Sequence, residues 1–432
     1  MEFSTSFLKK ILKTVFFIFC VPAISFAGSG AFRVELPDAG ALGKGSAFVG
    51  EANTPAAVYY NPAGLSQLQA SQVSLGTAWL APYVDYEGPS GAETQMRRNQ
   101  FWIPHVYLGV PLTQRIVLGL GATSYFGLGT EWAEDSFAKY VATESNIENK
   151  DYMLTLAYKL SEHLGFAVST DSDTSKANKK KKLAQTGAAD GDFELNAKST
   201  GWGYRLATMY KLNGQHQFGL MYRSTIRHKY RGKAYLDKLN SGGVNYQAIF
   251  GGTYYETELS EEFVLPQSVV LGYSFKPDPK WTFNADLEWM DWSSVEQELI
   301  NWESETDATR LSVLNDGNPA RRDWRSVWSF ALGTEYAASD RLRLRGGYYH
   351  HQTPIPEANW EPNLPDSDSN GLTAGVGYDV IPHRMTLDLA YSALFYKDRR
   401  IDNTVGSSSG VSIDGEYSQW ASMFLATVTY RF

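Results

Sequence analysis

The sequence predicts an all-β protein: a transmembrane antiparallel β-barrel of about fourteen strands whose lumen is plugged by an N-terminal segment. Three observations support this prediction. Alternating apolar and polar runs fill most of the chain, aromatic residues make up 14% of it, and short connections alternate with long polar ones. A soluble sandwich also alternates, but it rarely has so many strands of about nine or more residues with tryptophan at both ends.

The first 27 residues predict a secretory signal peptide. Three lysines precede an apolar run over residues 15–24, and Ser25 and Ala27 supply the small residues of a cleavage site. The run is too short to be a comfortable membrane span. Because the only cysteine, Cys20, falls in this segment, we expect no disulfide and no thiolate metal site in the mature chain.

Composition narrows the class of protein further. The formal net charge is −8 without a concentrated basic domain, which argues against nucleic acid as a partner. Mean hydropathy is −0.32, although the chain has 12 Trp and 26 Tyr. Barrels of the outer membrane combine these features, because every other residue faces a polar lumen. We expect no cofactor and no metal.

Residues 71–432 are predicted to form the barrel. In the closing run QWASMFLATVTYRF, Trp420, Phe424 and Val428 fall on a face that suits lipid, and the other face is mixed. The runs KWTFNADLEW and RLRLRGGYYH alternate in the same way. A terminal Phe432 after alternating aromatics resembles the assembly signal of such barrels, so we expect the barrel assembly machinery as a partner.

The connections differ in length on the two sides of the predicted barrel. Short ones, such as PLTQR at 111–115 and LNGQ at 212–215, alternate with long polar ones. This asymmetry is typical of an outer-membrane barrel of a Gram-negative bacterium, and an even strand number leaves the C-terminus periplasmic. Long loops are expected near the following residues: 129–150, 171–198, 230–257, 301–323, 352–370 and 397–417.

Residues 28–70 precede the first strand and are predicted to be the plug. They carry Gly40, Gly43, Gly45 and Gly50 with small residues between them, and irregular backbone can find hydrogen-bond partners inside a barrel. Their last part, VYYNPAGLSQL at 58–68, is interpreted as the joint between plug and first strand. Pro62 fixes one backbone angle, and Asn61 can bond locally to hold the turn.

The segment 28–68, GSGAFRVELPDAGALGKGSAFVGEANTPAAVYYNPAGLSQL, resembles the N-terminal hatch of the FadL/TodX family of outer-membrane transporters for long-chain fatty acids and hydrocarbons. The signature Asn61-Pro62-Ala63 is part of this resemblance. The resemblance covers nearly all of the mature chain in order, and it weakens at 171–198 and 233–257. It continues through the closing strand and these segments: 219–232, 263–294, 322–357 and 361–380.

The resemblance implies capture of a hydrophobic ligand at the outer loops, transfer to an inner pocket, and release sideways through a gap at a kink in the third strand. In IVLGLGATSYFGLG at 116–129, four glycines are candidates for that kink: Gly119, Gly121, Gly127 and Gly129. We therefore expect passive transport of long-chain fatty acids, with aromatic hydrocarbons as the alternative. A surface adhesin or structural barrel and an open porin are the other hypotheses.

Candidate ligand-binding residues fall into two sets. Alternation places Arg223, Arg227, Arg343 and Arg345 toward the lumen, where they could meet a fatty-acid carboxylate. The alternative is a structural ion network with Asp286, Glu288, Glu335 and Asp388. The second set, Tyr246, Phe250, Tyr254 and Tyr255, is a candidate capture groove, with packing between loops as the alternative. The run KANKKKK at 176–182 is interpreted as a solvated loop face touching anionic lipopolysaccharide, with attraction of acidic lipid or a fatty-acid anion as the alternative. Outer-membrane lipid and lipopolysaccharide are the expected partners.

Enzymatic activity is not expected. GSSSG at 406–410 matches the G-x-S-x-G pattern, but it lies in a Gly/Ser-rich loop and not at a strand–elbow–helix junction. His350 and His351 have no carboxylate at metal-ligand spacing. No residue is predicted to be catalytic.

Overall fold

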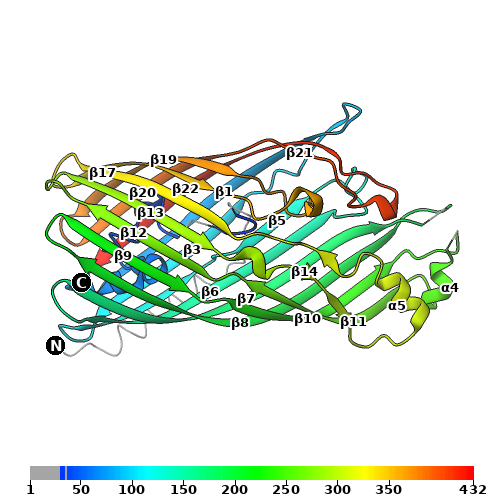
Figure 1. Ribbon diagram of the computed structural model, residues 1–432, viewed down its shortest axis with the longest axis horizontal. Helices are drawn as coiled ribbons and strands as arrows, with labels where there is room; N and C mark the ends of the chain where they lie inside the picture. The colour runs from blue at the N-terminus through cyan, green and yellow to red at the C-terminus, as the bar shows by residue number, and fades with distance from the viewer. Residues whose placement is uncertain (1–29, 35–36, 186, 243) are drawn as a thin grey trace.

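The computed structural model describes residues 30–34, 37–185, 187–242 and 244–432, so the predicted signal peptide lies outside the described residues. Fourteen strands form one closed antiparallel barrel, in which β22 pairs with β1 (Figure 1). The predicted fold class is confirmed. The wall strands are β1 (Gln72–Glu87), β3 (Phe101–Pro111), β4 (Ile116–Thr123), β6 (Glu144–Lys159), β7 (Leu164–Leu183), β8 (Gly191–Lys211), β9 (His216–Arg223), β12 (Ser268–Phe275), β13 (Trp281–Met290), β17 (Val327–Ala337), β18 (Leu342–His351), β19 (Ser369–Ile381), β20 (Met385–Tyr396) and β22 (Gly415–Arg431).

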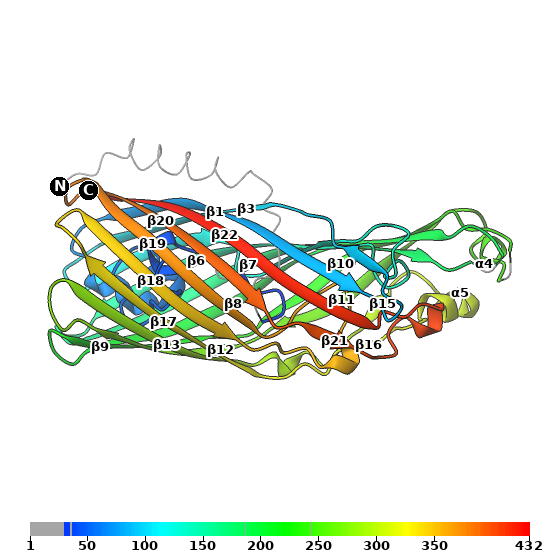
Figure 2. The same ribbon diagram turned by 90° about the horizontal axis from the view of Figure 1, so that it is seen from above.

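The long connections gather at one end of the barrel, away from the C-terminus, and the short turns lie at the other end (Figures 1 and 2). No helix in the described part of the chain is long and apolar enough to cross a membrane. Additional elements extend the wall or cover the long-loop end: β2 (Glu93–Gln95), β5 (Gly127–Glu131), β10 (Ile226–Asp237), β11 (Tyr255–Leu265), β14 (Gln297–Glu298), β15 (Ile300–Trp302), β16 (Ala320–Arg321), β21 (Arg399–Ile401), α4 (Tyr246–Phe250), α5 (Ala308–Leu314), η2 (Trp292–Ser294), η3 (Glu357–Asn359) and η4 (Ser407–Ser409).

The prediction of a long loop at 171–198 is wrong. β7 and β8 pair continuously from Leu164↔Tyr210 to Leu183↔Gly191, so only a short connection separates them. The prediction rests on polar residues at both odd and even positions of this segment. Beyond the membrane, however, both faces of a strand can be polar, and antiparallel pairing satisfies the backbone whatever the side chains are.

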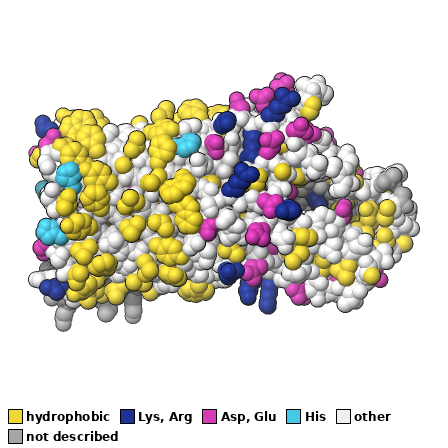
Figure 3. Space-filling view, in the orientation of Figure 1, with side chains coloured by type: hydrophobic (Ala, Val, Ile, Leu, Met, Phe, Trp, Pro, Cys, Tyr) yellow, Lys and Arg dark blue, Asp and Glu magenta, His cyan; other side chains and the backbone are white. Residues whose placement is uncertain are grey.

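On the face that Figure 3 shows, apolar side chains cover the barrel wall as a broad band, and charged side chains become frequent toward the long-loop end. The predicted alternation holds in the closing strand, where Trp420, Phe424 and Val428 are exposed while Thr427 is buried. Barrel strands in a bilayer alternate in this way, with lipid on one face and the lumen on the other.

The hatch lies inside the barrel (Figures 1 and 2). Its elements are α2 (Ala39–Leu42), α3 (Ala57–Tyr60) and η1 (Pro62–Gln67). α2 contacts β19, β20 and β22, whereas η1 contacts β4, β6, β7 and β8 on the other side. The hatch therefore spans the lumen from wall to wall.

Glycines of the wall let the hatch backbone approach the strands closely. A Cβ added to Gly333 would lie 2.2 Å from the Lys44 carbonyl oxygen, and one added to Gly347 would lie 2.2 Å from the Gly45 nitrogen. No side chain fits at such distances, since the obstacle is backbone. Three more strands contribute glycines that contact the hatch backbone in the same way: Gly219, Gly272 and Gly375.

Buried polar contacts with β13 also hold the hatch in place. Asp286 of β13 accepts hydrogen bonds from the backbone nitrogens of Phe48 at 2.8 Å and Val49 at 2.9 Å. Glu51 pairs with Lys44 at 2.5 Å and accepts a bond from Asn284 of β13 at 2.8 Å. If the hatch moved away, Asp286 and Asn284 of the wall would lose these buried partners, whereas the Lys44–Glu51 pair lies within the hatch.

Gly347→Val tests this seating. The added side chain would overlap the hatch backbone, so we expect the hatch to lose its position while the outer wall still forms. Limited proteolysis should then cut within residues 37–68, and conductance in planar bilayers should rise. Gly346→Val is the matched control, because a Cβ there meets its nearest neighbours only at 4.0 Å. Equal protection of the hatch in both variants would contradict the close fit.

Candidate functional site: an interrupted wall beside an aromatic cluster

The hydrogen-bond ladder of the wall is interrupted between β3 and its neighbour. β4 pairs with β3 from Val106↔Ala122 to Pro111↔Val117, but β5, which continues the same strand, pairs with β6. No ladder joins β5 to β3 in the described part of the chain. At the long-loop end, Arg97 N donates to Glu131 O at 2.8 Å. We call the resulting interruption between 101–105 and 127–129 the window.

The window exists because the chain kinks inward at residues 124–126. There the backbone turns to the hatch: Val34 N donates to Tyr125 O at 2.7 Å, and Gly127 N donates to Phe32 O at 2.8 Å. The hatch thus replaces hydrogen bonds that β3 would otherwise provide. The Phe101 ring lies across the window, 2.7 Å from where a Cβ on Gly129 would be.

Behind the kink lies a buried group of rings that we call the aromatic cluster. Phe32 of the hatch is at its centre, with ring centroids 5.5 Å from Phe126 and 5.5 Å from Trp292. Phe263 and Trp324 complete it at 5.6 and 6.4 Å from Phe32. Aromatic pairs at these distances attract one another beyond the burial of their surface, so the cluster joins hatch, kink and outer wall.

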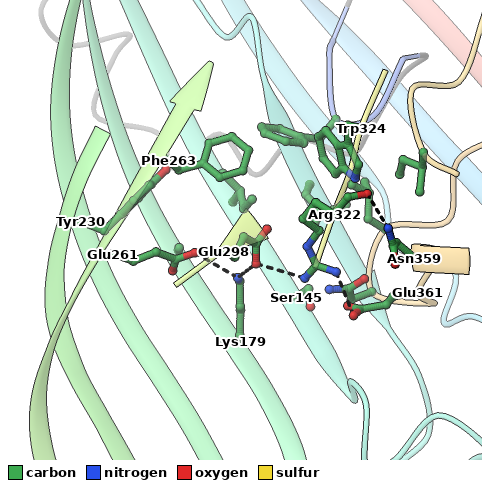
Figure 4. A pocket seen from close by; sticks show the side chains of 17 residues that line it. Ser145, Lys179, Tyr230, Glu261, Phe263, Glu298, Arg322, Trp324, Asn359 and Glu361 are labelled. Atoms are coloured by element: carbon green, nitrogen blue, oxygen red, sulfur yellow. Dashed lines mark hydrogen bonds and ion pairs between the residues drawn. The ribbon is translucent and has the colours of Figure 1, made fainter. Parts of the chain in front are cut away.

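Beyond the cluster, toward the long-loop end, a cavity of about 50 Å³ is lined by apolar and charged side chains (Figure 4). Phe32, Phe263 and Trp324 of the aromatic cluster form part of its wall. An apolar cavity of about 150 Å³ is known to admit benzene. This outer cavity is therefore nearly closed, and a larger hydrophobic molecule enters only if side chains move apart.

The charged part of the outer cavity is a chain of ion pairs, which Figure 4 shows. Glu298 pairs with Lys179 at 3.1 Å and with Arg322 at 3.1 Å, and Arg322 also pairs with Glu361 at 2.8 Å. Glu261 lies farther off, 4.0 Å from Lys179. The cavity thus contains two cations among three carboxylates.

Glu298 and Glu261 differ in the direction in which their pKa values are shifted. Burial alone would raise the pKa of Glu298, but Arg322 and Lys179 outweigh burial and hold that pKa below its ordinary range. Burial raises the pKa of Glu261, and Lys179 offsets this only in part. Glu298 therefore stays ionised, and Glu261 takes up a proton more readily. An entering anion would have to compete with Glu298 or Glu361 for the two cations.

An inner cavity of about 60 Å³ lies between the hatch and the wall. Arg205 of β8 lines it and donates to Val58 O at 3.2 Å and Tyr59 O at 3.0 Å. The Arg223 guanidinium lies 3.7 Å from the centre of the Tyr125 ring in the kink. The two arginines thus attach the hatch and the kink to the same part of the wall.

Hydrogen bonds of Asn61 and apolar contacts hold the joint at 58–68. Asn61 Oδ1 accepts a bond from Ala63 N at 3.1 Å, and its Nδ2 donates to Val49 O at 2.9 Å and Thr208 O at 3.2 Å. Leu65 and Leu68 lie against Gly119 and Gly109 of the wall. Asn61 therefore joins two parts of the hatch to β8.

Three of the four predicted lumen arginines form ion pairs inside the barrel: Arg223 with Asp151, Arg343 with Asp379, and Arg345 with Glu335 and Asp388. Arg345 thus has the partners of the alternative hypothesis, a structural network. Ligand binding by these residues stays a prediction. Of the four, only Arg223 lines one of the two cavities.

The expectation that Arg227 faces the lumen is wrong. It is exposed and pairs with Glu262 at 3.0 Å, while His228 faces inward. Residues 224–225 lie between β9 and β10 and change the phase of the alternation. Register arguments fail across such a break, because a shift by one residue exchanges the two faces of a strand.

The remaining predicted residues lie apart from the outer cavity. Phe250, Tyr246 and Tyr255 belong to a small core at the far tip, where α4 packs against α5, and Tyr254 is exposed. These contacts correspond to the alternative hypothesis, in which the aromatic residues pack one loop against another. Gly119 and Gly121 lie in regular β4 facing Val58, and Gly127 and Gly129 lie in β5. The kink falls between these pairs.

Sequence reasoning missed the aromatic cluster and the ion pairs of the outer cavity. Trp292 and Trp324 each follow an aspartate, in Asp291-Trp292-Ser293 and Asp323-Trp324-Arg325, and this repeated pattern could have marked them. Lys179 shares a strand face with Asp171 and Asp173, so continuing the alternation into KANKKKK would have placed it inside. Among the described residues, no group of three His, Cys, Asp or Glu side chains could hold a metal ion.

Comparisons with known proteins agree with this architecture. A family model described as outer membrane protein transport protein (OMPP1/FadL/TodX) matches residues 20–432. The long-chain fatty acid transport protein of Escherichia coli (strain K12) is 23% identical and aligns over 88% of each chain. Among solved structures, a FadL homologue from Pseudomonas aeruginosa has a TM-score of 0.80 at 18% identity, covering 93% of this chain and 100% of that one. The toluene transporter TodX from P. putida has a TM-score of 0.68 at 20% identity, covering 94% and 99%.

A closed barrel of fourteen strands filled by an N-terminal hatch defines an outer-membrane transport channel. The chain belongs to the outer membrane protein transport family OMPP1/FadL/TodX, whose members carry hydrophobic compounds and are channels, not enzymes. The resemblance found in the sequence is thereby confirmed.

Asn61→Ala removes three hydrogen bonds at a fully buried position. Leaving a buried carbonyl without its donor costs about 1–3 kcal/mol, so we expect faster amide exchange in residues 49–68 at unchanged barrel assembly. Hydrogen-exchange mass spectrometry checks this. Asn61→Asp keeps the acceptor for Ala63 N but loses both donors, so it should show most of the effect. Wild-type exchange in Asn61→Asp would contradict an anchoring role for the donors.

Proposed function

We propose that this protein is a passive outer-membrane transporter of hydrophobic molecules, with long-chain fatty acids as the main substrates and aromatic hydrocarbons as the alternative. Its long loops face outside and its C-terminus faces the periplasm. The substrate is captured at the long-loop end, passes the aromatic cluster and leaves through the window into the membrane. The interrupted ladder between β3 and β5 is the observation that carries this proposal.

A sideways exit follows from the filled lumen. The hatch contacts strands on opposite sides of the barrel, and its backbone lies against five wall glycines, while the inner cavity between hatch and wall holds only about 60 Å³. The membrane, by contrast, is the preferred phase of a lipophile, since each CH₂ buried from water gains about 0.8 kcal/mol. No energy source is therefore needed once the substrate has passed the polar outer surface.

A hatch filling the lumen also disfavours an open porin for polar solutes. We propose residues 28–70 as this hatch, with Asn61-Pro62-Ala63 fixing it and the segment from Gly119 to Gly129 shaping the exit. Removing hatch contacts should create ion conductance that the intact protein lacks. A large, steady current through the wild-type protein would favour the porin instead.

The outer cavity supports an acidic amphiphile as the substrate. Its apolar side, with Phe32, Phe263 and Trp324, suits a hydrocarbon chain, and Lys179 and Arg322 suit a carboxylate. The name of the Escherichia coli relative points to the same substrate class. A fatty-acid carboxylate would replace Glu361 on Arg322 while the cavity opens around the chain.

Gly129→Leu tests the exit. The added side chain would meet the movable Phe101 ring and fill the window, so uptake of labelled oleate by cells should fall several-fold at equal amounts of folded barrel. Gly346→Leu adds the same side chain to the wall where neighbours are distant, and it should leave uptake unchanged. Equal uptake by both variants would argue against the window as the exit.

A pair of charge variants tests the substrate class. Arg322→Gln should weaken oleate binding about tenfold or more, since a charge-assisted hydrogen bond contributes roughly 1.5–3 kcal/mol. Glu361→Gln removes the competing carboxylate and should tighten oleate binding. Toluene, which is neutral, should bind both variants alike. Tryptophan fluorescence can follow binding near Trp324, and weaker oleate binding in Glu361→Gln would contradict the assignment.

A further inference from the structure

Three cations lie side by side on the outer face of the barrel, on neighbouring strands. Lys176 of β7 is the register partner of Lys198 of β8, and Lys198 is the register partner of Arg231 of β10. All three residues are exposed. We call them the cation row.

The residues in register with the cation row supply one carboxylate for three cations. This is Glu148 of β6, which is opposite Lys176 and also pairs with Lys150 at 3.2 Å. Ser260 of β11 is opposite Arg231; its neighbours Glu258 and Glu262 are opposite Lys233 and Lys229, and Glu262 pairs with Arg227 at 3.0 Å. Like charges directly opposite one another in a sheet are destabilising, so three adjacent cations indicate an anion that binds there.

Other cations at this end of the barrel are arranged differently. Lys180 pairs with Glu144 at 2.8 Å, Lys182 with Asp192 at 2.8 Å, and Lys233 with Glu256 at 3.0 Å. Each of these three lysines thus has a carboxylate partner on a neighbouring strand. The cation row departs from this pattern.

The level of the cation row in the membrane identifies the anion. Trp202 of β8 is 66% exposed on the same strand face as Lys198, and exposed Tyr152 and Tyr204 lie near its level. Such rings mark the edge of the hydrocarbon layer. Four residues separate Trp202 from Lys198, about 13 Å along the strand and about 10 Å in height for a strand tilted by about 40°. This is the level of lipid headgroups.

We propose that the cation row binds the phosphate groups of lipopolysaccharide in the outer leaflet. Its diphosphorylated sugar head carries several negative charges close together, which matches three cations in one row better than the single phosphate of a phospholipid does. The assignment rests on the proposed orientation, with the long loops outside. From the lysine run at 176–182 the cation row takes Lys176, whereas Lys179, Lys180 and Lys182 are engaged in ion pairs within the protein.

Native mass spectrometry of the purified barrel with diphosphoryl lipid A tests the proposal. The variant Lys176→Gln, Lys198→Gln, Arg231→Gln should bind lipid A at least about tenfold more weakly than the wild type, because charge-assisted contacts to phosphate are lost. The matched control, Lys180→Gln, Lys182→Gln, Lys233→Gln, removes the same charge and should bind as the wild type does. Monophosphoryl lipid A should bind more weakly than the diphosphoryl form.

Three results would overturn the proposal: unchanged lipid A binding by the triple variant, an equal loss in the control, or phosphatidylglycerol binding to the wild type as tightly as lipid A. The electrophoretic shift between folded and heated barrels shows that each variant is assembled. Oleate uptake, measured in parallel, should not depend on the cation row. A failure of the transport proposal would therefore appear in uptake and not in lipid A binding.

Discussion

In a hydrocarbon layer every backbone N–H and C=O group needs a hydrogen-bond partner within the protein, and this requirement determines both the wall and the seating of the hatch. Fourteen strands meet it by closing into a barrel. The third strand departs from the wall at residues 124–126, where Phe32 and Val34 of the hatch supply the backbone partners. An interruption in the wall is thus possible because a segment inside the barrel compensates for it.

This arrangement couples the hatch to the window. Phe32 is both a backbone partner of the kink and the centre of the aromatic cluster. Arg205 and Arg223 bind the joint and the kink from neighbouring strands of the wall. A molecule that separates the rings of the cluster would therefore disturb the same contacts that hold the window in its shape. In the proposed route, capture and release would thus be linked without a moving domain.

The sequence predicted the barrel because alternation and turn length depend only on local pattern, and the hatch because its residues resemble those of a family. Prediction failed where three-dimensional contacts decide. The phase change between Arg223 and Arg227 follows from two residues between strands, which no periodicity reveals. The outer cavity combines Lys179, Glu298 and Arg322 from separate parts of the chain. Their pairing requires the closed barrel and the folded long-loop end, so no local pattern predicts it.

Photo-crosslinking with a diazirine-labelled fatty acid during uptake tests the proposed sideways exit. If the fatty acid leaves through the window, adducts should form at residues 101–105 and 127–129, which border the window, and in the surrounding membrane lipid. Residues at the short-turn end of the hatch, such as Asn53 and Gln67, should remain unlabelled. Labelling of Asn53 and Gln67 with none at the window would show passage through the lumen and contradict a sideways exit.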